Sequence, residues 1–270
     1  MPSQDLIVDY LAYLRSESCS DRTIGDRKRI LTVMDSELPY GLYEACADEL
    51  KAWLWRDGLA MSSRETYYGA FNGFFGWAFE HGMIDFDPAS LIKRPKPPQR
   101  LPNPVTDGQL ADALDQACEQ VLLWVKLAAY AGLRCIDIEH LQRERITEQA
   151  ITVVQSKGGT ARIVPTHPII WEAVEHLPAG PLTDLDARQI SMRAWTYFHR
   201  TLKMRGVRMH RFRHWFGTMI QRLYKDILVT QRLMGHASPA TTAGYVLVAA
   251  EQTRAAVDLL PRFDAVAFAA

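Results

Sequence analysis

Long apolar runs, closely spaced cysteines and an excess of charge of either sign are all missing from this chain of 270 residues. No apolar run approaches the roughly 18 residues that a membrane-spanning helix needs, and the N-terminus does not begin like a signal peptide. We therefore expect no membrane partner. Disulfide bonds and a zinc site are not expected either, and a reducing cytoplasm fits, because the four cysteines are scattered: Cys19, Cys46, Cys118 and Cys135.

The formal net charge is zero, with 31 Lys and Arg against 31 Asp and Glu, which by itself argues against a nucleic-acid partner. The distribution of the charges points the other way. Between Arg188 and Arg232, eleven basic residues stand against one acid, Asp226. Such a density of positive charge predicts a surface that binds phosphate groups. A solvated helical face is the alternative interpretation of the same segment.

A proline-rich segment divides the chain. Residues 88–104 contain six prolines, and proline fixes φ and cannot continue a helix. We therefore expect an extended linker over 93–104 between two domains, 1–92 and 105–270. The linker is also basic, because four cations stand among its prolines: Lys93, Arg94, Lys96 and Arg100.

Periodicity predicts a mainly helical protein with one small β-hairpin. In the first domain apolar residues recur at helical spacing, and an aromatic stripe over 67–79 is typical of a hydrophobic core. In the second domain, 150–155 and 161–165 are β-branched and alternate apolar with polar residues. Ser156-Lys157-Gly158-Gly159 forms the expected turn between them. From Arg188 to about Leu260 the helical periodicity returns.

Two arginines are candidates for contacting a phosphodiester. Arg134 lies in Gly-Leu-Arg-x-x-Asp-Ile, and Arg213 lies far downstream in His-x-x-Arg-His. Without a metal, the charge that builds on phosphate oxygens in the transition state requires fixed cations. A guanidinium group suits this task because its planar fork donates two parallel hydrogen bonds. His210 lies three residues before Arg213 and would share its helix face.

Asp137 and His214 are candidates for supporting this pair. Asp137 follows Arg134 by three residues, and we expect it to orient an arginine or a helix end. His214 lies on the same predicted helix face as His210, four residues later. The sequence shows no carboxylate cluster with metal-ligand spacing, so we expect neither a catalytic metal nor another cofactor.

A late tyrosine completes the candidate chemistry. Tyr245 follows His236 by nine residues, and nearby arginines would favour its phenolate as a nucleophile. His236 would donate to the same phosphate, and Lys157 would protonate the leaving oxygen. Taken singly, each has an ordinary interpretation: a packed tyrosine, a histidine in a turn and a flexible surface lysine.

Together these residues resemble the signature of the tyrosine recombinase (phage integrase) family, and the resemblance spans nearly the whole chain. It implies a helical core-binding domain joined to a mixed catalytic domain. It also implies cleavage and rejoining of double-stranded DNA core sites through a 3′-phosphotyrosyl intermediate and a Holliday junction. The signature residues, in order, are Arg134, Lys157, His210, Arg213, His236 and Tyr245.

The resemblance further implies a homotetramer on DNA that exchanges C-terminal tails, with host DNA-bending or directionality factors as further partners. Because a helix is expected close to Met1, the type implied is a small arm-less integrase of a phage or mobile element, acting on DNA in the cytoplasm. Other basic residues are candidates for DNA contact: Arg22, Arg27, Lys28, Arg64, Lys93, Arg94, Arg208 and Arg211.

Three alternatives share part of this pattern. An Xer-like resolvase of chromosome or plasmid dimers would use identical chemistry. A type IB topoisomerase shares the chemistry, but the two-domain layout and the 25 residues after Tyr245 favour a recombinase. A DNA-binding regulator of the same fold would have lost cleavage, and the intact six-residue signature argues against it.

Overall fold

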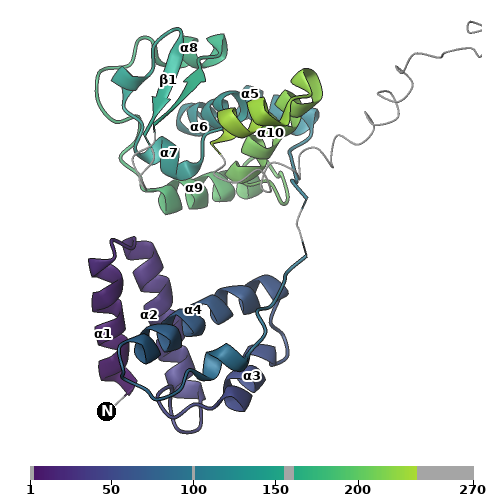
Figure 1. Cartoon of the computed structure of the whole chain (residues 1–270). Coiled ribbons are helices and arrows are strands. Elements are labelled where there is room, and N and C mark those ends of the chain that lie inside the picture. The colour runs from purple at the N-terminus through teal and green to yellow at the C-terminus, as the bar shows by residue number, and fades with distance from the viewer. Residues whose placement is uncertain (1–2, 99–100, 155–160, 236–270) are drawn as a thin grey trace, which may run out of the picture. The chain divides into compact units, whose positions relative to one another are not determined.

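The chain forms two compact units, Met1–Gln99 and Arg100–Ala270, called here the N-terminal and the C-terminal unit (Figure 1). Their structure is a computed structural model that describes residues 3–98, 101–154 and 161–235. None of the helices within these ranges combines the length and apolar composition needed to cross a membrane.

The N-terminal unit is a helical bundle with an aromatic core. The predicted stripe on its last long helix supplies that core: Phe71, Phe74 and Phe75 are buried, whereas Phe79 at the end of the stripe is 49% exposed. Tyr10 packs edge-on against Phe74, with ring centroids 5.6 Å apart. The elements of this unit are α1 (Ser3–Ser16), α2 (Asp21–Glu37), α3 (Ala47–Trp55), α4 (Met61–Glu80) and the 3-10 helix η1 (Pro88–Leu91).

The first residues of the proline-rich segment lie against this bundle. Ile92 belongs to its core, and Pro95 is buried. Between them, a guanidinium nitrogen of Arg94 lies 3.0 Å from a carboxylate oxygen of Glu65 on α4. Residues 93–98 and 101–104 form no helix or strand.

The C-terminal unit is mainly helical with one antiparallel strand pair, so the predicted fold class is confirmed. The strands pair Ala150 with Pro165 and Val153 with Arg162. The predicted turn with Lys157 lies outside the described residues, as does the predicted helical region after Gly235. The elements are α5 (Asp107–Gln116), α6 (Glu119–Ala131), α7 (Cys135–Glu139), the 3-10 helix η2 (Arg143–Arg145), β1 (Ala150–Val153), β2 (Arg162–Pro165), α8 (Pro168–Val174), α9 (Ala187–Arg200), α10 (Met209–Tyr224) and α11 (Ile227–Met234).

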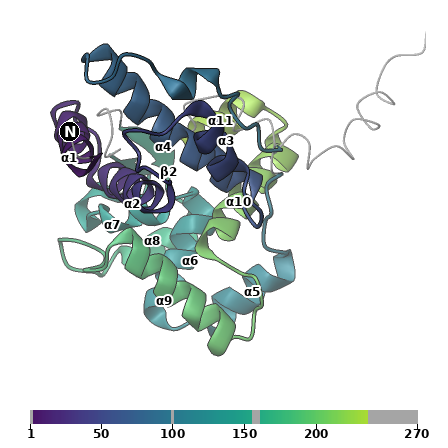
Figure 2. The ribbon, with the colours of Figure 1, turned by 90° about the horizontal axis from the view of Figure 1, so that it is seen from below.

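Helix α6 is the centre of this unit. It is apolar around most of its circumference, and Trp124 and Leu127 are completely buried, as expected of a helix covered on several sides. Helices α5, α8 and α10 pack against it (Figures 1 and 2). The helix ends at Gly132, whose φ of 63° places it in the left-handed region that glycine adopts most readily.

Gly132 also leaves room for a neighbour on α10. A Cβ at this position would lie 2.6 Å from Cδ1 of Phe216, far closer than two carbon atoms can approach. Glycine is therefore required at this position for two separate reasons: the backbone has a positive φ, and a side chain would collide with Phe216. The same turn leads directly into Leu133 and Arg134.

We expect Gly132→Ala to destabilise the C-terminal unit by about 1–3 kcal/mol beyond the effect of the positive φ, because the added methyl group overpacks Phe216. Gly206→Ala is the matched control: its φ is 75°, and the nearest atom to its added Cβ, Nη1 of Arg211, would lie 3.8 Å away. Thermal melting of both variants measures the difference. Equal melting temperatures would show that the contact with Phe216 is not limiting.

Candidate active site

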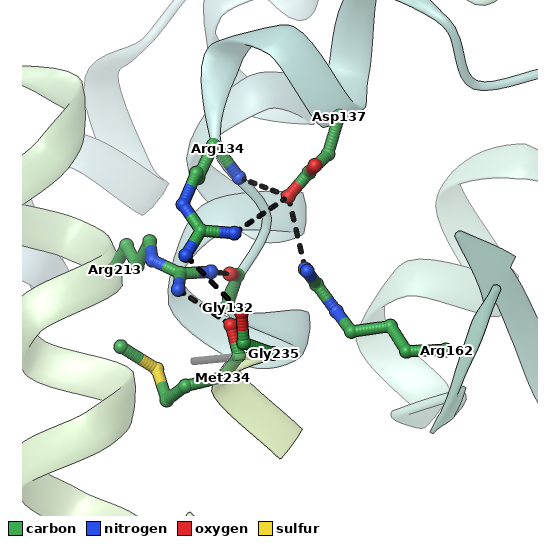
Figure 3. A network of polar contacts seen from close by, with 7 residues as sticks. All are labelled: Gly132, Arg134, Asp137, Arg162, Arg213, Met234 and Gly235. Atoms are coloured by element: carbon green, nitrogen blue, oxygen red, sulfur yellow. Dashed lines mark hydrogen bonds and ion pairs between the residues drawn. The ribbon is translucent and has the colours of Figure 1, made fainter. Parts of the chain in front are cut away.

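Asp137 joins the start of α7 to strand β2. Its Oδ2 accepts a hydrogen bond from the backbone N–H of Arg134 at 2.9 Å and one from Nη2 of Arg162 at 2.9 Å. The same oxygen lies 4.0 Å from Nη1 of Arg134. Figure 3 shows these contacts converging on one carboxylate. Asp137 therefore holds the start of α7 and ties it to strand β2.

Arg213 of α10 joins the ends of two other helices. Its Nη1 donates to the carbonyl of Gly132 at the end of α6, and its Nη2 donates to the carbonyl of Met234 at 2.6 Å. Met234 is the last residue of α11. Helix C-termini leave carbonyls without intrahelical partners and carry partial negative charge. A cation at this position satisfies both helix ends, and Arg213 is accordingly 1% exposed.

Arg134 reaches the next carbonyl along the chain. Its Nη2 donates to the carbonyl of Gly235 at 3.4 Å, so Arg134 and Arg213 bind consecutive carbonyls at the end of α11. The side chain of Arg134 is 33% exposed. Of the two predicted arginines, Arg134 is therefore the one that reaches solvent. The structure brings both together with Asp137, as Figure 3 shows.

His210 and His214 lie beside these arginines on α10. Their rings meet edge to face, with centroids 4.4 Å apart. Loss of hydration lowers the pKa of His210, and the charges of Arg213 and Arg134 lower it further. Burial lowers the pKa of His214 to about 4, with contributions from His210, Arg213 and Arg211. Both imidazoles are therefore neutral at pH 7, and each has one nitrogen that donates and one that accepts.

Arg162 is a residue of this site that sequence reasoning missed, because it lies within the predicted hairpin and outside the six-residue signature. It begins β2 and is 8% exposed. A signal for it existed: Arg162 and Val164 alternate with exposed residues along the strand, so the pattern places an arginine on the buried face. A buried cation requires a charged or polar partner, and that partner is Asp137.

Several predicted DNA-binding residues have partners within the protein. Arg211 donates to the carbonyls of Asn103 (3.2 Å), Pro104 (2.9 Å) and Gly206 (3.2 Å). The bonds to Asn103 and Pro104 fasten the segment before α5 to the start of α10. Arg208, which precedes α10, is exposed.

In the N-terminal unit, Arg64 donates to the carbonyl of Arg56 at 3.1 Å and lies over the ring of Trp55. Arg94 pairs with Glu65, and Arg27 and Arg94 both line a cavity of about 400 Å³. The remaining candidates are exposed: Arg22, Lys28 and Lys93.

Lys157, His236 and Tyr245 lie outside the described residues. His236 directly follows Gly235, whose carbonyl accepts from Arg134. Across the described parts of the chain, no group of three His, Cys, Asp or Glu side chains is arranged to hold a metal ion. A hollow of about 680 Å³ between α9 and the start of α6 contains none of the residues in the arginine network.

Comparisons with known proteins agree on one family. The model of the phage integrase family matches residues 106–252. The tyrosine recombinase XerD of Vibrio cholerae is 24% identical over 94% of this chain and 95% of its own length. A tyrosine recombinase of Thermosipho africanus is 27% identical over 97% of both chains.

Solved structures share the fold. A lambda integrase dimer bound to a COC′ core site has a TM-score of 0.72 at 19% identity, covering 88% of this chain and 96% of that chain. The Tn1549 transposon integrase in complex with transposon right end DNA has a TM-score of 0.73 at 16% identity, covering 95% of this chain and all of that chain. The predicted family is confirmed.

The lowered pKa of His214 predicts a stability that depends on pH. The ordinary histidine value is 6.5, and the folded value is about 4, so between these values the unfolded chain binds more protons. The free energy of unfolding therefore falls as the pH is lowered from 7 toward 4. We expect His214→Gln to lose less stability than wild type over this range in thermal melting.

His176→Gln is the control for removing one imidazole, because the side chain of His176 is 88% exposed. The same loss of stability in wild type and His214→Gln would contradict the assignment of a neutral, half-buried His214.

Proposed function

The chain belongs to the phage integrase family and is a tyrosine-type site-specific DNA recombinase, and we propose that it integrates and excises phage or mobile-element DNA through a covalent bond between Tyr245 and a DNA 3′ phosphate. The observation that carries this proposal is the convergence of Arg134 and Arg213 at the end of α11, with His210 within reach of the charges of both. The chain continues from there, through Gly235 and His236, to Tyr245.

The proposed step is an exchange of one phosphodiester for another. The phenol of Tyr245 gives its proton to water and its oxygen attacks phosphorus, the bond to the deoxyribose 5′ oxygen breaks, and that oxygen takes up a proton from Lys157. The phosphate ends on Tyr245 as a 3′-phosphotyrosyl ester. Because the covalent bond retains the energy of the original linkage, a second DNA end can reverse the step without ATP.

Arg134 and His210 are the residues of the described site that we assign to the phosphate oxygens. Arg134 carries a permanent charge and a partly exposed fork. His210 loses part of its hydration but stays accessible to solvent, and its neutral imidazole can donate one hydrogen bond to an oxygen. Fixed donors of this kind stabilise charge as it develops and need no reorganisation during the step.

We propose that the N-terminal unit and the segment 93–104 bind double-stranded core sites, and that the chain acts as a homotetramer whose C-terminal tails couple neighbouring active sites. One solved structural relative is a lambda integrase tetramer bound to a Holliday junction, which supports an assembly of this kind. Host DNA-bending or directionality factors would act on that assembly.

Resolution of chromosome or plasmid dimers is the second candidate function. The curated relatives that cover nearly the whole chain include the XerD recombinase named above and an XerC recombinase of Mycobacterium, which favours it. The chemistry would be the same, and only the DNA sites and their arrangement would differ. A cleavage-deficient regulator is the alternative of another class.

Tyr245→Phe tests the nucleophile. On a nicked duplex selected from a random library by binding to the protein, wild type should accumulate a covalent protein–DNA adduct, and the variant should form none. Its affinity should stay within a few-fold, because affinity comes mainly from phosphate contacts. Adduct formation by Tyr245→Phe would remove the assignment, and no adduct with wild type would favour the regulator.

Arg134 and Arg213 should separate catalysis from stability. Arg134→Ala should slow adduct formation roughly 10²-fold, as expected when one fixed charge donor is removed, with a near-normal melting temperature. Arg213→Ala should also unfold more easily, by about 1–3 kcal/mol for each buried carbonyl left without its donor. Thermal melting measures the stability of each variant, and single-turnover cleavage measures its rate of adduct formation. Unchanged cleavage in Arg134→Ala would contradict its role.

A further inference from the structure

The guanidinium group of Arg162 has a polar partner at one of its three nitrogens. Nη2 pairs with Asp137 at 2.9 Å, whereas Nε and Nη1 are buried and have no hydrogen-bond partner among the residues that the structure describes. Burying donors of a charged group without partners is costly. An apolar side chain beside Val164 would avoid that cost, so packing alone does not explain an arginine at this position.

The unpaired side of Arg162 faces the turn at Gly235. A Cβ on Gly235 would lie 2.6 Å from Nη1 of Arg162 and 2.8 Å from its Cδ. Gly235 also has a φ of 60°, so both its conformation and its surroundings require glycine. The guanidinium group of Arg162 thus occupies the space that any other residue at 235 would need.

Gly235 is therefore contacted by two arginines. Arg134 donates to its carbonyl, and Arg162 packs against its α carbon. Both arginines also meet at Asp137. Figure 3 shows the bond from Arg162 of β2 to Asp137 and the bonds from Arg134 and Arg213 to the carbonyls at the end of α11.

We propose that Arg162 is a positioning residue of the recombination reaction: through Asp137 it fixes Arg134, and through its contact with Gly235 it sets the turn from which the chain continues to His236. This inference rests on the proposed function, because it assigns Arg134 to the phosphate. Arg162 itself is 8% exposed, and it acts through its neighbours and not by touching DNA.

The first experiment compares Arg162→Met, Arg162→Lys and wild type in single-turnover adduct formation at saturating protein. Arg162→Met should slow the step about tenfold or more, because small misplacements of a catalytic group have large effects on rate. Its DNA affinity should remain within a few-fold. Arg162→Lys, which keeps a cation for Asp137, should recover part of the rate.

Arg143→Met is the matched control. Arg143 also binds within the C-terminal unit, through the carbonyls of Val174, Ile146 and Glu175, but it lies outside the network at Asp137. It should melt at a lower temperature than wild type and cleave at the wild-type rate when folded. If Arg162→Met behaved in the same way, its role would be structural only, and the proposal would be overturned.

A second experiment tests the contact between Arg162 and Gly235 from the side of the glycine. Gly235→Ala should slow adduct formation, because its methyl group displaces the guanidinium of Arg162. Combined with Arg162→Met, the two losses should not multiply: the double variant should cleave no more slowly than Gly235→Ala, since methionine can move away from the methyl group. Losses that multiply would show two independent effects and would contradict the proposal.

The outcomes separate this inference from the proposed function. If wild type forms no adduct with Tyr245, the proposed function fails. If wild type forms the adduct and Arg162→Met forms it at the same rate, only the positioning role fails. A fall in affinity as large as the fall in rate would make Arg162 a DNA contact and would also overturn the inference.

Discussion

The candidate site depends on guanidinium groups that bind the carbonyls at the ends of helices. Arg213 joins the end of α6 to the end of α11 through Gly132 and Met234. Carbonyls at a helix C-terminus lack partners of their own and carry partial negative charge, so one buried cation satisfies both. Each of these helices ends at a glycine with a left-handed backbone conformation: Gly132 for α6 and Gly235 for α11. Each one directs the chain toward a residue of the proposed reaction.

Charged side chains surround these helix ends. Arg134, Arg162 and Arg213 bring three permanent positive charges, and Asp137 is the carboxylate that contacts two of them. The lowered pKa values of His210 and His214 keep those side chains neutral at pH 7, which avoids adding further positive charge. Guanidinium groups that are held in place in this way suit an anionic oxygen, because they need no reorganisation.

The sequence was sufficient for the fold class and for part of the site. Spacing of three residues correctly predicts that Asp137 lies at Arg134 and that His210 lies near Arg213, because such contacts are local to one turn or one helix. It could not show that Arg213 is buried, since the carbonyls it binds lie 81 and 21 residues away in the chain and carry no side-chain signal. For the same reason it could not show that Arg211 binds backbone carbonyls within its own unit. The alternation along β2 predicts the hairpin, and the same alternation places Arg162 on the buried face of the strand.

The most direct test is to locate the covalent bond in the wild-type protein. Trypsin should release the segment between Arg232 and Arg254 as one peptide, and this peptide contains a single tyrosine, Tyr245. After reaction with a nicked core site, mass spectrometry should find the nucleotide on that tyrosine, in buffer containing EDTA as well as in magnesium. A nucleotide on any other residue, or no linked peptide from protein that binds the same DNA, would contradict the assignment of this chain as a DNA-cleaving recombinase that uses Tyr245.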